Sequence, residues 1–199
     1  MVRELISPWA VFLDRDGTLN EHVGLVSEPD QLELISGVAA GLRRLHEAGA
    51  QLVLVTNQPV IARELTDESG LQRIHDRLQQ LLVDEGVRLD AIYYCPHHPE
   101  THHPEANNPE YRRECDCRKP KPGMIRQAAA DLGLDLARSC MVGDSTRDIA
   151  AARAAGCAAV LVRTGSAGED GVCEGVEPDA VVDDVSAAAD WILKNRNTA

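Results

Sequence analysis

The chain has 199 residues, 44% of them hydrophobic, which is enough for a globular domain with a core of its own. Its 20 Lys and Arg residues against 32 Asp and Glu residues give a formal net charge of −12 at pH 7, which argues against nucleic acid or an anionic membrane as the main partner. No apolar run approaches the ~20 residues of a membrane span, and the first residues lack the apolar segment and cleavage site of a signal peptide, so we expect a cytoplasmic protein with reduced thiols.

Apolar runs alternate with segments of helical period along most of the chain. We expect strands at six apolar runs, which cover residues 9–13, 51–55, 91–94, 140–142, 158–162 and 180–182. We expect five helices, which run from 37 to 49, from a Thr66 cap to Gly86, from 122 to 133, and onward from Ser145 and from Ser186. The second helix would bury one face formed by Leu71, Ile74, Leu78 and Leu81. The alternation predicts an α/β fold, with a doubly wound and mostly parallel sheet in a single domain 1–199, whose ligands bind beyond the carboxyl ends of the strands.

Two carboxylates, Asp14 and Asp16, follow the first expected strand directly. Both can face the same crevice if the chain turns between them, and Gly17 permits such a turn. This spacing suits a division of labour in phosphoryl transfer. One carboxylate attacks phosphorus and forms an aspartyl-phosphate, while the other donates a proton to the leaving oxygen and later takes one from water. The alternative reading of the same residues is an Asp-rich turn.

Neutral and cationic groups suited to phosphoryl oxygens follow two other segments. Thr56, Asn57 and Gln58 end the second expected strand and offer a hydroxyl and two amides, although these residues are also ordinary turn chemistry. Lys119 precedes a segment in which prolines flank Lys121 and stiffen the chain, and phosphoryl transfer needs cationic charge that is already in place. A basic cluster in so acidic a chain favours a functional role for Lys119.

Asp144, at the end of the fourth expected strand, is a candidate magnesium ligand. A Mg²⁺ ion that bridges a phosphate takes one or two carboxylates and keeps water in its other positions. Asp14 would supply the second carboxylate, and the backbone carbonyl of Asp16 a third oxygen. Ser145 and Asp148 have capping-box spacing, so a plain helix cap is the alternative for these two residues.

A loop at 95–117 carries a CxH pair, Cys95 and His97, and a CxC pair, Cys115 and Cys117. Tetrahedral zinc takes four such ligands, and four protein ligands leave no open position for water or substrate. The pattern therefore predicts a structural zinc site, which would order this charged and Pro-rich segment. We interpret the remaining histidines of the loop as surface residues, with a role as alternate zinc ligands as the competing interpretation: His98, His102 and His103.

Taken in chain order, Asp-x-Asp-Gly-Thr, Thr-Asn, Lys-Pro and Gly-Asp-x-x-x-Asp resemble the four motifs of the haloacid dehalogenase superfamily of aspartate-based phosphotransferases. The segments FLDRDGTLN at 12–20, YYCPHHP at 93–99 and CDCRKP at 115–120 further resemble the D,D-heptose 1,7-bisphosphate phosphatases, relatives of the histidinol-phosphate phosphatases. The resemblance implies a Rossmannoid fold without a large cap domain and a monomer. It also implies removal of the C7 phosphate from a heptose 1,7-bisphosphate in the synthesis of nucleotide-activated heptose.

Residue roles follow from this resemblance. It implies that Asp14 is the nucleophile, that Asp16 is the general acid/base, and that Thr56 and Lys119 hold the transferring phosphoryl group. The implied cofactors are Mg²⁺, on Asp14, Asp16 and Asp144, and structural Zn²⁺, on Cys95, His97, Cys115 and Cys117. Substrate contacts are implied for Arg15, Asn20, His22, Val23, Gly24, Leu25, Asn57, Gln58, Pro59 and Arg118, the last directed at the other phosphate. His22-Val23-Gly24-Leu25 stands where the best-known members have Asp-His-Gly-Tyr, and Pro59 where they have serine, so the preferred anomer and the sugar itself stay open.

Three other functions compete with this one. A phosphatase for histidinol phosphate or another small phosphomonoester would use the same catalytic residues. A receiver-like phosphoacceptor also places Asp, Mg²⁺, Thr and Lys at strand ends, but a general acid/base at Asp16 promotes turnover over a long-lived phosphoryl group. A zinc module that binds nucleic acid fits poorly with the charge of −12 and the 3% aromatic content.

Overall fold

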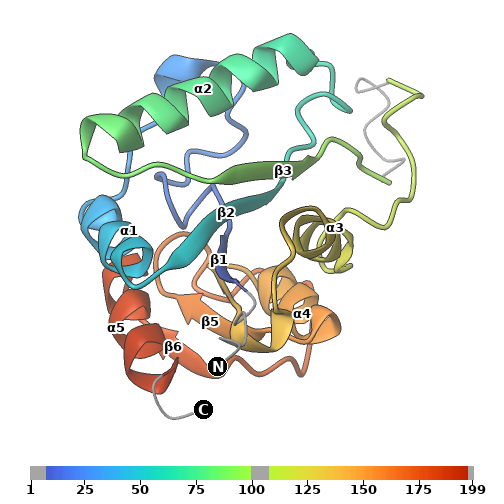
Figure 1. Cartoon of the computed structure of the whole chain (residues 1–199). Helices are drawn as coiled ribbons and strands as arrows, with labels where there is room; N and C mark the ends of the chain where they lie inside the picture. Colours follow the sequence, from blue (N-terminus) through green and yellow to red (C-terminus); the bar gives the residue numbers. More distant parts are fainter. Residues whose placement is uncertain (1–7, 100–107, 197–199) are drawn as a thin grey trace.

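The fold is built on one six-stranded sheet, seen in a computed structural model that describes residues 8–99 and 108–196 (Figure 1). The strand order is β3-β2-β1-β4-β5-β6, and all five neighbouring pairs are parallel. The strands are β1 Trp9–Leu13, β2 Ala50–Asn57, β3 Ala91–Cys95, β4 Cys140–Gly143, β5 Ala158–Val162 and β6 Ala180–Val182. The predicted parallel sheet is confirmed, and each predicted strand lies within one or two residues of the observed one.

Helices cover both faces of the sheet, as the doubly wound prediction requires. They are α1 Val38–Glu47, α2 Glu68–Asp84, α3 Gly123–Leu132, α4 Thr146–Ala155 and α5 Val185–Arg196, with short 3₁₀ turns η1 Pro29–Gln31 and η2 Leu136–Arg138. Side chains of α1, α2 and α5 join the core on one face, and those of α3 and α4 join the core on the other. In the part of the chain that the structure describes, no helix is both long enough and apolar enough to cross a membrane.

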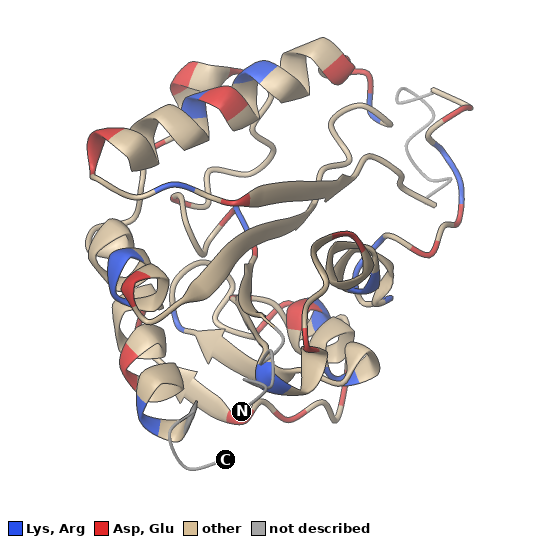
Figure 2. Ribbon diagram, viewed as in Figure 1, with Lys and Arg blue, Asp and Glu red and all other residues tan. Residues whose placement is uncertain are grey.

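Strand β1 shows why the sheet is buried on both sides. Its alternate residues Trp9, Val11 and Leu13 belong to one core cluster, while Ala10 and Phe12 belong to the other. None of the six strands carries Asp, Glu, Lys or Arg, and Figure 2 shows the charged residues on helices and loops instead. Packing of the core therefore does not explain a buried charged residue at the end of a strand, and its presence there indicates another role.

Two predicted helix starts differ from the structure. Asp67 caps α2, because its carboxylate accepts a hydrogen bond from the backbone N–H of Gly70 at 2.7 Å, whereas Thr66 lies one residue before the cap. Both residue types cap helices well, so the sequence did not distinguish them. Helix α5 begins at Val185, one residue before the predicted Ser186, and Asp184 accepts from the N–H of Ala187.

The buried face of α2 gives a test of its packing. Leu71, Ile74 and Leu78 are fully buried as predicted, but Leu81 is only partly buried and Leu82 completes the face. We expect Leu78→Ala to lower the free energy of unfolding by about 2–5 kcal/mol, because it leaves a cavity in the core. Leu81→Ala is the matched control and should cost clearly less. Urea denaturation measures both, and equal losses would contradict this assignment of the face.

Candidate active site

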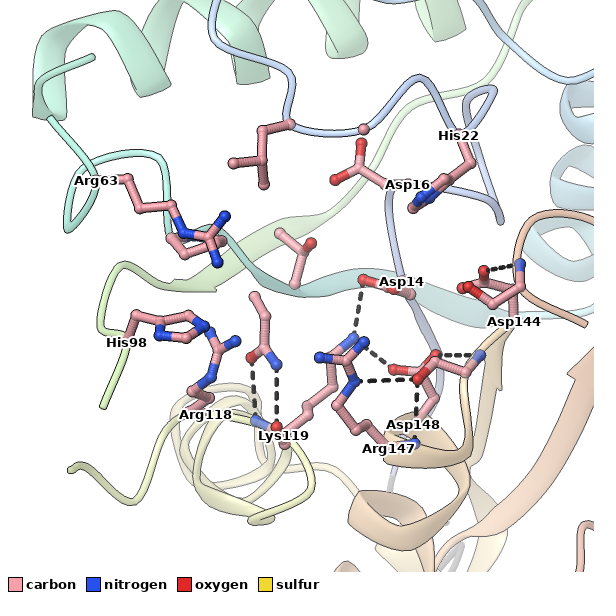
Figure 3. Close-up of a pocket in the computed structure, with 17 residues that line it drawn as sticks. Asp14, Asp16, His22, Arg63, His98, Arg118, Lys119, Asp144, Arg147 and Asp148 are labelled. Atoms are coloured by element: carbon pink, nitrogen blue, oxygen red, sulfur yellow. Dashed lines mark hydrogen bonds and ion pairs between the residues drawn. The ribbon is translucent and has the colours of Figure 1, made fainter. Parts of the chain in front are cut away.

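A cavity of about 220 Å³ lies beyond the carboxyl ends of the strands and collects most of the predicted site residues (Figure 3). The order of the sheet explains its place. The chain builds β2 and β3 on one side of β1 and then crosses to β4 on the other side, so the strand order reverses at β1. Predicted residues that line the cavity are Asp14, Asp16, His22, Gly24, Leu25, Thr56, Asn57, Pro59, Arg118, Lys119 and Asp144. Residues that line it without having been predicted as site residues are Arg63, His98, Ser145, Arg147, Asp148 and Ser166.

The ammonium group of Lys119 lies at the floor of this cavity and is almost fully buried. Its Nζ atom lies 2.8 Å from a carboxylate oxygen of Asp14 and 2.7 Å from one of Asp148, and it donates to the backbone carbonyl of Val55 at 2.8 Å. Burial lowers the pKa of Lys119, but the two carboxylates raise it by more, so the net shift is upward and the group stays charged. The cation is thus held ready beside the predicted nucleophile.

Three carboxylates, Asp14, Asp144 and Asp148, each place an oxygen within 4.8 Å of the others. Burial, and then the nearby charge of Asp14, raise the pKa of Asp144. A divalent cation would relieve this repulsion, and three hard oxygen ligands are the donor set that suits Mg²⁺. The side chain of Asp16 is not part of the cluster.

Glycines allow Asp144 to sit where it does. A Cβ atom on Gly17 would lie 2.5 Å from Asp144 Oδ2, and one on Gly165 would lie 2.3 Å from the same oxygen. The backbone N–H of Ser166 donates to that oxygen at 2.6 Å. Two distant loops therefore close around one carboxylate, and a larger residue at either glycine would displace it.

Asp148 has two roles, of which the sequence indicated one. Its Oδ2 atom accepts from the backbone N–H of Ser145 at 3.0 Å, in the predicted capping box at the start of α4. Its Oδ1 atom pairs with Lys119. Burial raises the pKa of Asp148, against the opposing charge of Lys119. A capping residue does not need full burial, so the cap alone does not explain why Asp148 is buried. The available signal in the sequence for its second role was the motif that places a carboxylate four residues after Asp144.

Asp16 is held by three side chains that point at its carboxylate. Arg15 donates from Nε and Nη2 at 3.0 and 2.9 Å, Asn20 donates at 3.0 Å, and Gln58 donates at 2.9 Å. Burial alone would raise the pKa of Asp16, but these donors, Arg15 above all, bring the net shift downward. In Figure 3 a dashed line joins Asp14 to Lys119, while Asp16 stands apart from that pair. Arg15, Asn20 and Gln58 are buried and support Asp16 from behind, outside the residues that line the cavity.

Behind Arg15 lies His75 of α2, a residue that the sequence did not single out. Its side chain is buried and its ring centroid lies 5.4 Å from that of Tyr94. Burial and the charge of Arg15 lower the pKa of His75 to about 4, so its imidazole is neutral at pH 7. Nε2 of His75 and Nη1 of Arg15 are buried without a hydrogen-bond partner among the described residues.

The amide of Asn57 fixes the backbone on which Lys119 stands. Its Oδ1 atom accepts from the N–H of Lys119 at 3.0 Å, and its Nδ2 atom donates to the carbonyl of the same residue at 3.0 Å. The neighbouring Thr56 is buried and its hydroxyl accepts from Gln58 at 2.9 Å. Asn57 thus joins the end of β2 to the segment after the Cys-rich loop.

The predicted zinc ligands lie together. Cys95, His97, Cys115 and Cys117 each offer a ligand atom, and all four atoms lie within 4.8 Å of one another. Cys117 Sγ lies 3.1 Å from Cys95 Sγ, 3.2 Å from Cys115 Sγ and 3.4 Å from His97 Nδ1. Hydrogen bonding, first with Cys95, lowers the pKa of Cys117 to about 5, toward the thiolate form that binds metal. Three thiols and one imidazole in this arrangement fit a closed tetrahedral site. His102 and His103 lie outside the described residues.

The entrance of the cavity combines apolar and cationic groups. Val23 is exposed and does not line the cavity, whereas Leu25, in the same short segment, does. Arg118 donates to the carbonyl of His97 at 3.0 Å, which ties it to the Cys-rich loop. Figure 3 shows Arg63, His98 and Arg118 on one side of the cavity and Asp144 on the other.

Comparisons with known proteins agree with this geometry. Residues 116–188 match the family model described as HAD-hydrolase-like. The D-glycero-beta-D-manno-heptose-1,7-bisphosphate 7-phosphatase of Haemophilus ducreyi is 50% identical over 160 residues, which cover 79% of this chain and 85% of the relative. The enzyme of the same name from Escherichia coli K12 is 43% identical over 187 residues, 94% of this chain and 88% of the relative.

Two solved structures are also similar. The D,D-heptose 1,7-bisphosphate phosphatase from B. bronchiseptica, in complex with magnesium and phosphate, has a TM-score of 0.78 and 38% identity and covers 94% of this chain and 99% of its own. A putative HAD-like phosphatase from Mesorhizobium loti has a TM-score of 0.80 and 33% identity and covers 96% of this chain and 87% of its own.

The buried imidazole of His75 predicts a pH dependence of stability. Between pH 6.5 and about 4 the unfolded chain binds a proton at His75 and the folded chain does not, so stability is lost as the pH falls through this window. We expect the loss in the wild type to exceed that in His75→Gln by up to about 3 kcal/mol, measured by urea denaturation at a series of pH values. His46→Gln, at an exposed position of α1, is the matched control. Parallel pH profiles for the wild type and His75→Gln would contradict the neutral buried imidazole.

Proposed function

This chain belongs to the D-glycero-beta-D-manno-heptose-1,7-bisphosphate 7-phosphatase family, and we propose that it removes the C7 phosphate of the β anomer of that sugar bisphosphate. The observation that carries the proposal is the buried contact between Lys119 and Asp14 at the floor of a cavity lined by carboxylates and arginines. A phosphoryl group needs placed cationic charge next to an attacking carboxylate, and this contact supplies both. The product would enter the synthesis of nucleotide-activated heptose.

In the proposed mechanism the carboxylate of Asp14 attacks the phosphorus and forms an aspartyl-phosphate, while the bond from phosphorus to the C7 oxygen breaks. Asp16 gives that oxygen a proton. In the second step Asp16 takes a proton from a water molecule, whose oxygen attacks the phosphorus. The bond from phosphorus to the Asp14 oxygen then breaks, which frees the carboxylate and releases inorganic phosphate. The donors around Asp16 favour its ionised form, which is the form the second step needs. For the first step Asp16 has to take up a proton, which requires a weaker contact with Arg15.

Asp14 and Asp144, with the backbone carbonyl of Asp16, would hold Mg²⁺, and the position of Asp148 adds a third nearby carboxylate. The ion would neutralise charge on the phosphoryl oxygens and orient them. Lys119 and Thr56 would bind the same oxygens from the protein side, and Asn57 would keep Lys119 in position.

We further propose that Cys95, His97, Cys115 and Cys117 bind structural zinc. A closed site suits a role in shaping the loop, because no position is left for substrate. The loop carries Arg118 and Lys119 directly after Cys117. Cysteine ligands stay reduced in the cytoplasm, where we propose that the protein acts, as a monomer on a small phosphorylated sugar and without a nucleic-acid or membrane partner.

The substrate is tested by phosphate release with Mg²⁺ from both anomers of heptose 1,7-bisphosphate, from fructose 1,6-bisphosphate and from histidinol phosphate. We expect kcat/KM for the β heptose to be at least about 10-fold above the others. Asp14→Asn is the control and should lose on the order of 10³-fold or more, since an amide cannot attack phosphorus. Equal low rates on every substrate would reject the heptose assignment. Preference for histidinol phosphate would select that phosphatase, and a burst without steady release would select a phosphoacceptor.

The zinc proposal predicts a loss of both metal and activity in Cys117→Ser. We expect its zinc content, measured by elemental analysis, to fall well below one ion per chain, and its kcat/KM to fall about 10- to 100-fold because Arg118 and Lys119 are less well held. Cys173→Ser, which removes a thiol outside the cluster, should retain zinc. A zinc-stripped wild type with full turnover would exclude this supporting role.

A further inference from the structure

The connection between β5 and β6 is bound to the start of α4. In this connection Gly168 donates from its backbone N–H to the carbonyl of Asp144 at 2.7 Å. The carboxylate of Asp170 accepts from the Thr146 hydroxyl at 2.6 Å, from the Thr146 N–H at 3.2 Å and from the Ser145 hydroxyl. The N–H of Cys173 donates to the Thr146 hydroxyl at 3.1 Å. All of these contacts end on the segment that directly follows β4.

Arg147 lies in that segment and reaches the cavity. Its Nε atom lies 3.2 Å from the Ser145 hydroxyl oxygen and 3.5 Å from Asp170 Oδ2. The Arg147 side chain is 34% exposed, whereas that of Asp170 is 7% exposed. Figure 3 shows the Arg147 side chain extending from α4 toward the part of the cavity that Asp14 and Lys119 line. The buried carboxylate thus holds the inner end of a guanidinium group whose outer nitrogens face the cavity.

Arg147 is one of three arginines that line the cavity, with Arg63 and Arg118. They come from three separate segments of the chain and line the same cavity. The charge of Lys119 is already balanced by Asp14 and Asp148. In a chain of net charge −12, three arginines on one cavity concentrate positive charge there, and such a region suits an anionic ligand.

We propose that Arg147 is a specificity-determining residue, which binds an anionic group of the substrate other than the phosphoryl group being transferred, and that Asp170 is the positioning residue that aims it. The inference rests on the proposed function, because a sugar bisphosphate carries such a second anion. A bound arginine loses rotamer freedom, and a carboxylate that fixes its inner end lowers this cost before the substrate arrives. The β5–β6 connection is thereby part of the substrate site.

The test compares heptose 1,7-bisphosphate with p-nitrophenyl phosphate, which has a single phosphate. For Arg147→Gln we expect kcat/KM to fall about 10-fold or more further on the bisphosphate than on p-nitrophenyl phosphate, mainly through KM, because a charge-assisted contact is lost. Asp170→Asn should shift the same ratio in the same direction by a smaller factor. The double variant should be no worse than Arg147→Gln, since the two residues act through one contact. Arg147→Lys, which retains the charge, should recover part of the ratio.

Arg163→Gln and Asp183→Asn are matched controls, because this exposed pair also has a 3.5 Å Nε to carboxylate distance and lies outside the cavity. Thermal unfolding checks that Asp170→Asn is folded. Equal losses on both substrates, or additive losses in the double variant, would show that Asp170 only caps α4 and would overturn the inference.

Binding separates this inference from the proposed function. If the wild type releases no phosphate from heptose 1,7-bisphosphate, the proposed function fails. Calorimetry on Asp14→Asn then compares fructose 1,6-bisphosphate with fructose 6-phosphate, with and without Arg147→Gln. Tighter binding of the bisphosphate that is lost with Arg147 supports the inference, and equal affinity for the two sugars in Asp14→Asn overturns it.

Discussion

The site depends on one buried ammonium group. A lysine that is removed from water loses solvation worth several kcal/mol, and this loss has to be recovered by contacts with good geometry. The Nζ of Lys119 has three N–H donors and meets three acceptors, on Asp14, Asp148 and Val55. These acceptors come from the end of β1, from α4 and from β2, so one side chain connects three elements of the fold. Loss of either carboxylate would leave a buried charge under-compensated, and the alignment of the strand ends is therefore tied to the chemistry.

Hydrogen bonds also hold the backbone around Lys119 in place. Asn57 makes two hydrogen bonds to the main chain of Lys119, and Arg118 binds the carbonyl of His97. The Cys and His cluster ends two residues earlier, at Cys117. Without these contacts, a polar and Pro-rich segment would have to order a buried lysine by itself, at a cost in conformational entropy for each residue fixed. A metal bound in the cluster would order part of this segment before substrate binds.

Much of the fold and of the site centre could be predicted because the signals are local. Apolar runs gave the strands, and the carboxyl ends of adjacent parallel strands bring Asp14, Thr56 and Asp144 together whatever the details of the loops. The remainder depends on contacts between distant segments. Asp170 lies 24 residues from Thr146 along the chain, and His75 approaches Arg15 only after α2 has packed on the sheet. Neither contact leaves a pattern in the sequence. The choice between Asp67 and Thr66 as the cap of α2 is equally hidden, because it depends on whether the Asp67 carboxylate or the Thr66 hydroxyl accepts from the first free backbone N–H groups of the helix.

The balance of charge in the cavity bears on the class of substrate. Lys119 is paired with two carboxylates, so it adds little net positive charge to the site. The carboxylates that suit Mg²⁺ are themselves negative, and a cation bound there would be needed before an anion is attracted to them. The arginines are different, since Arg118 has no carboxylate partner among the described residues and Arg147 meets one only at 3.5 Å. Positive charge is therefore available at the arginine side of the cavity as well as at the metal. A ligand with one anionic group satisfies one of these regions, and a ligand with two anionic groups satisfies both, which is the arrangement expected for a bisphosphate.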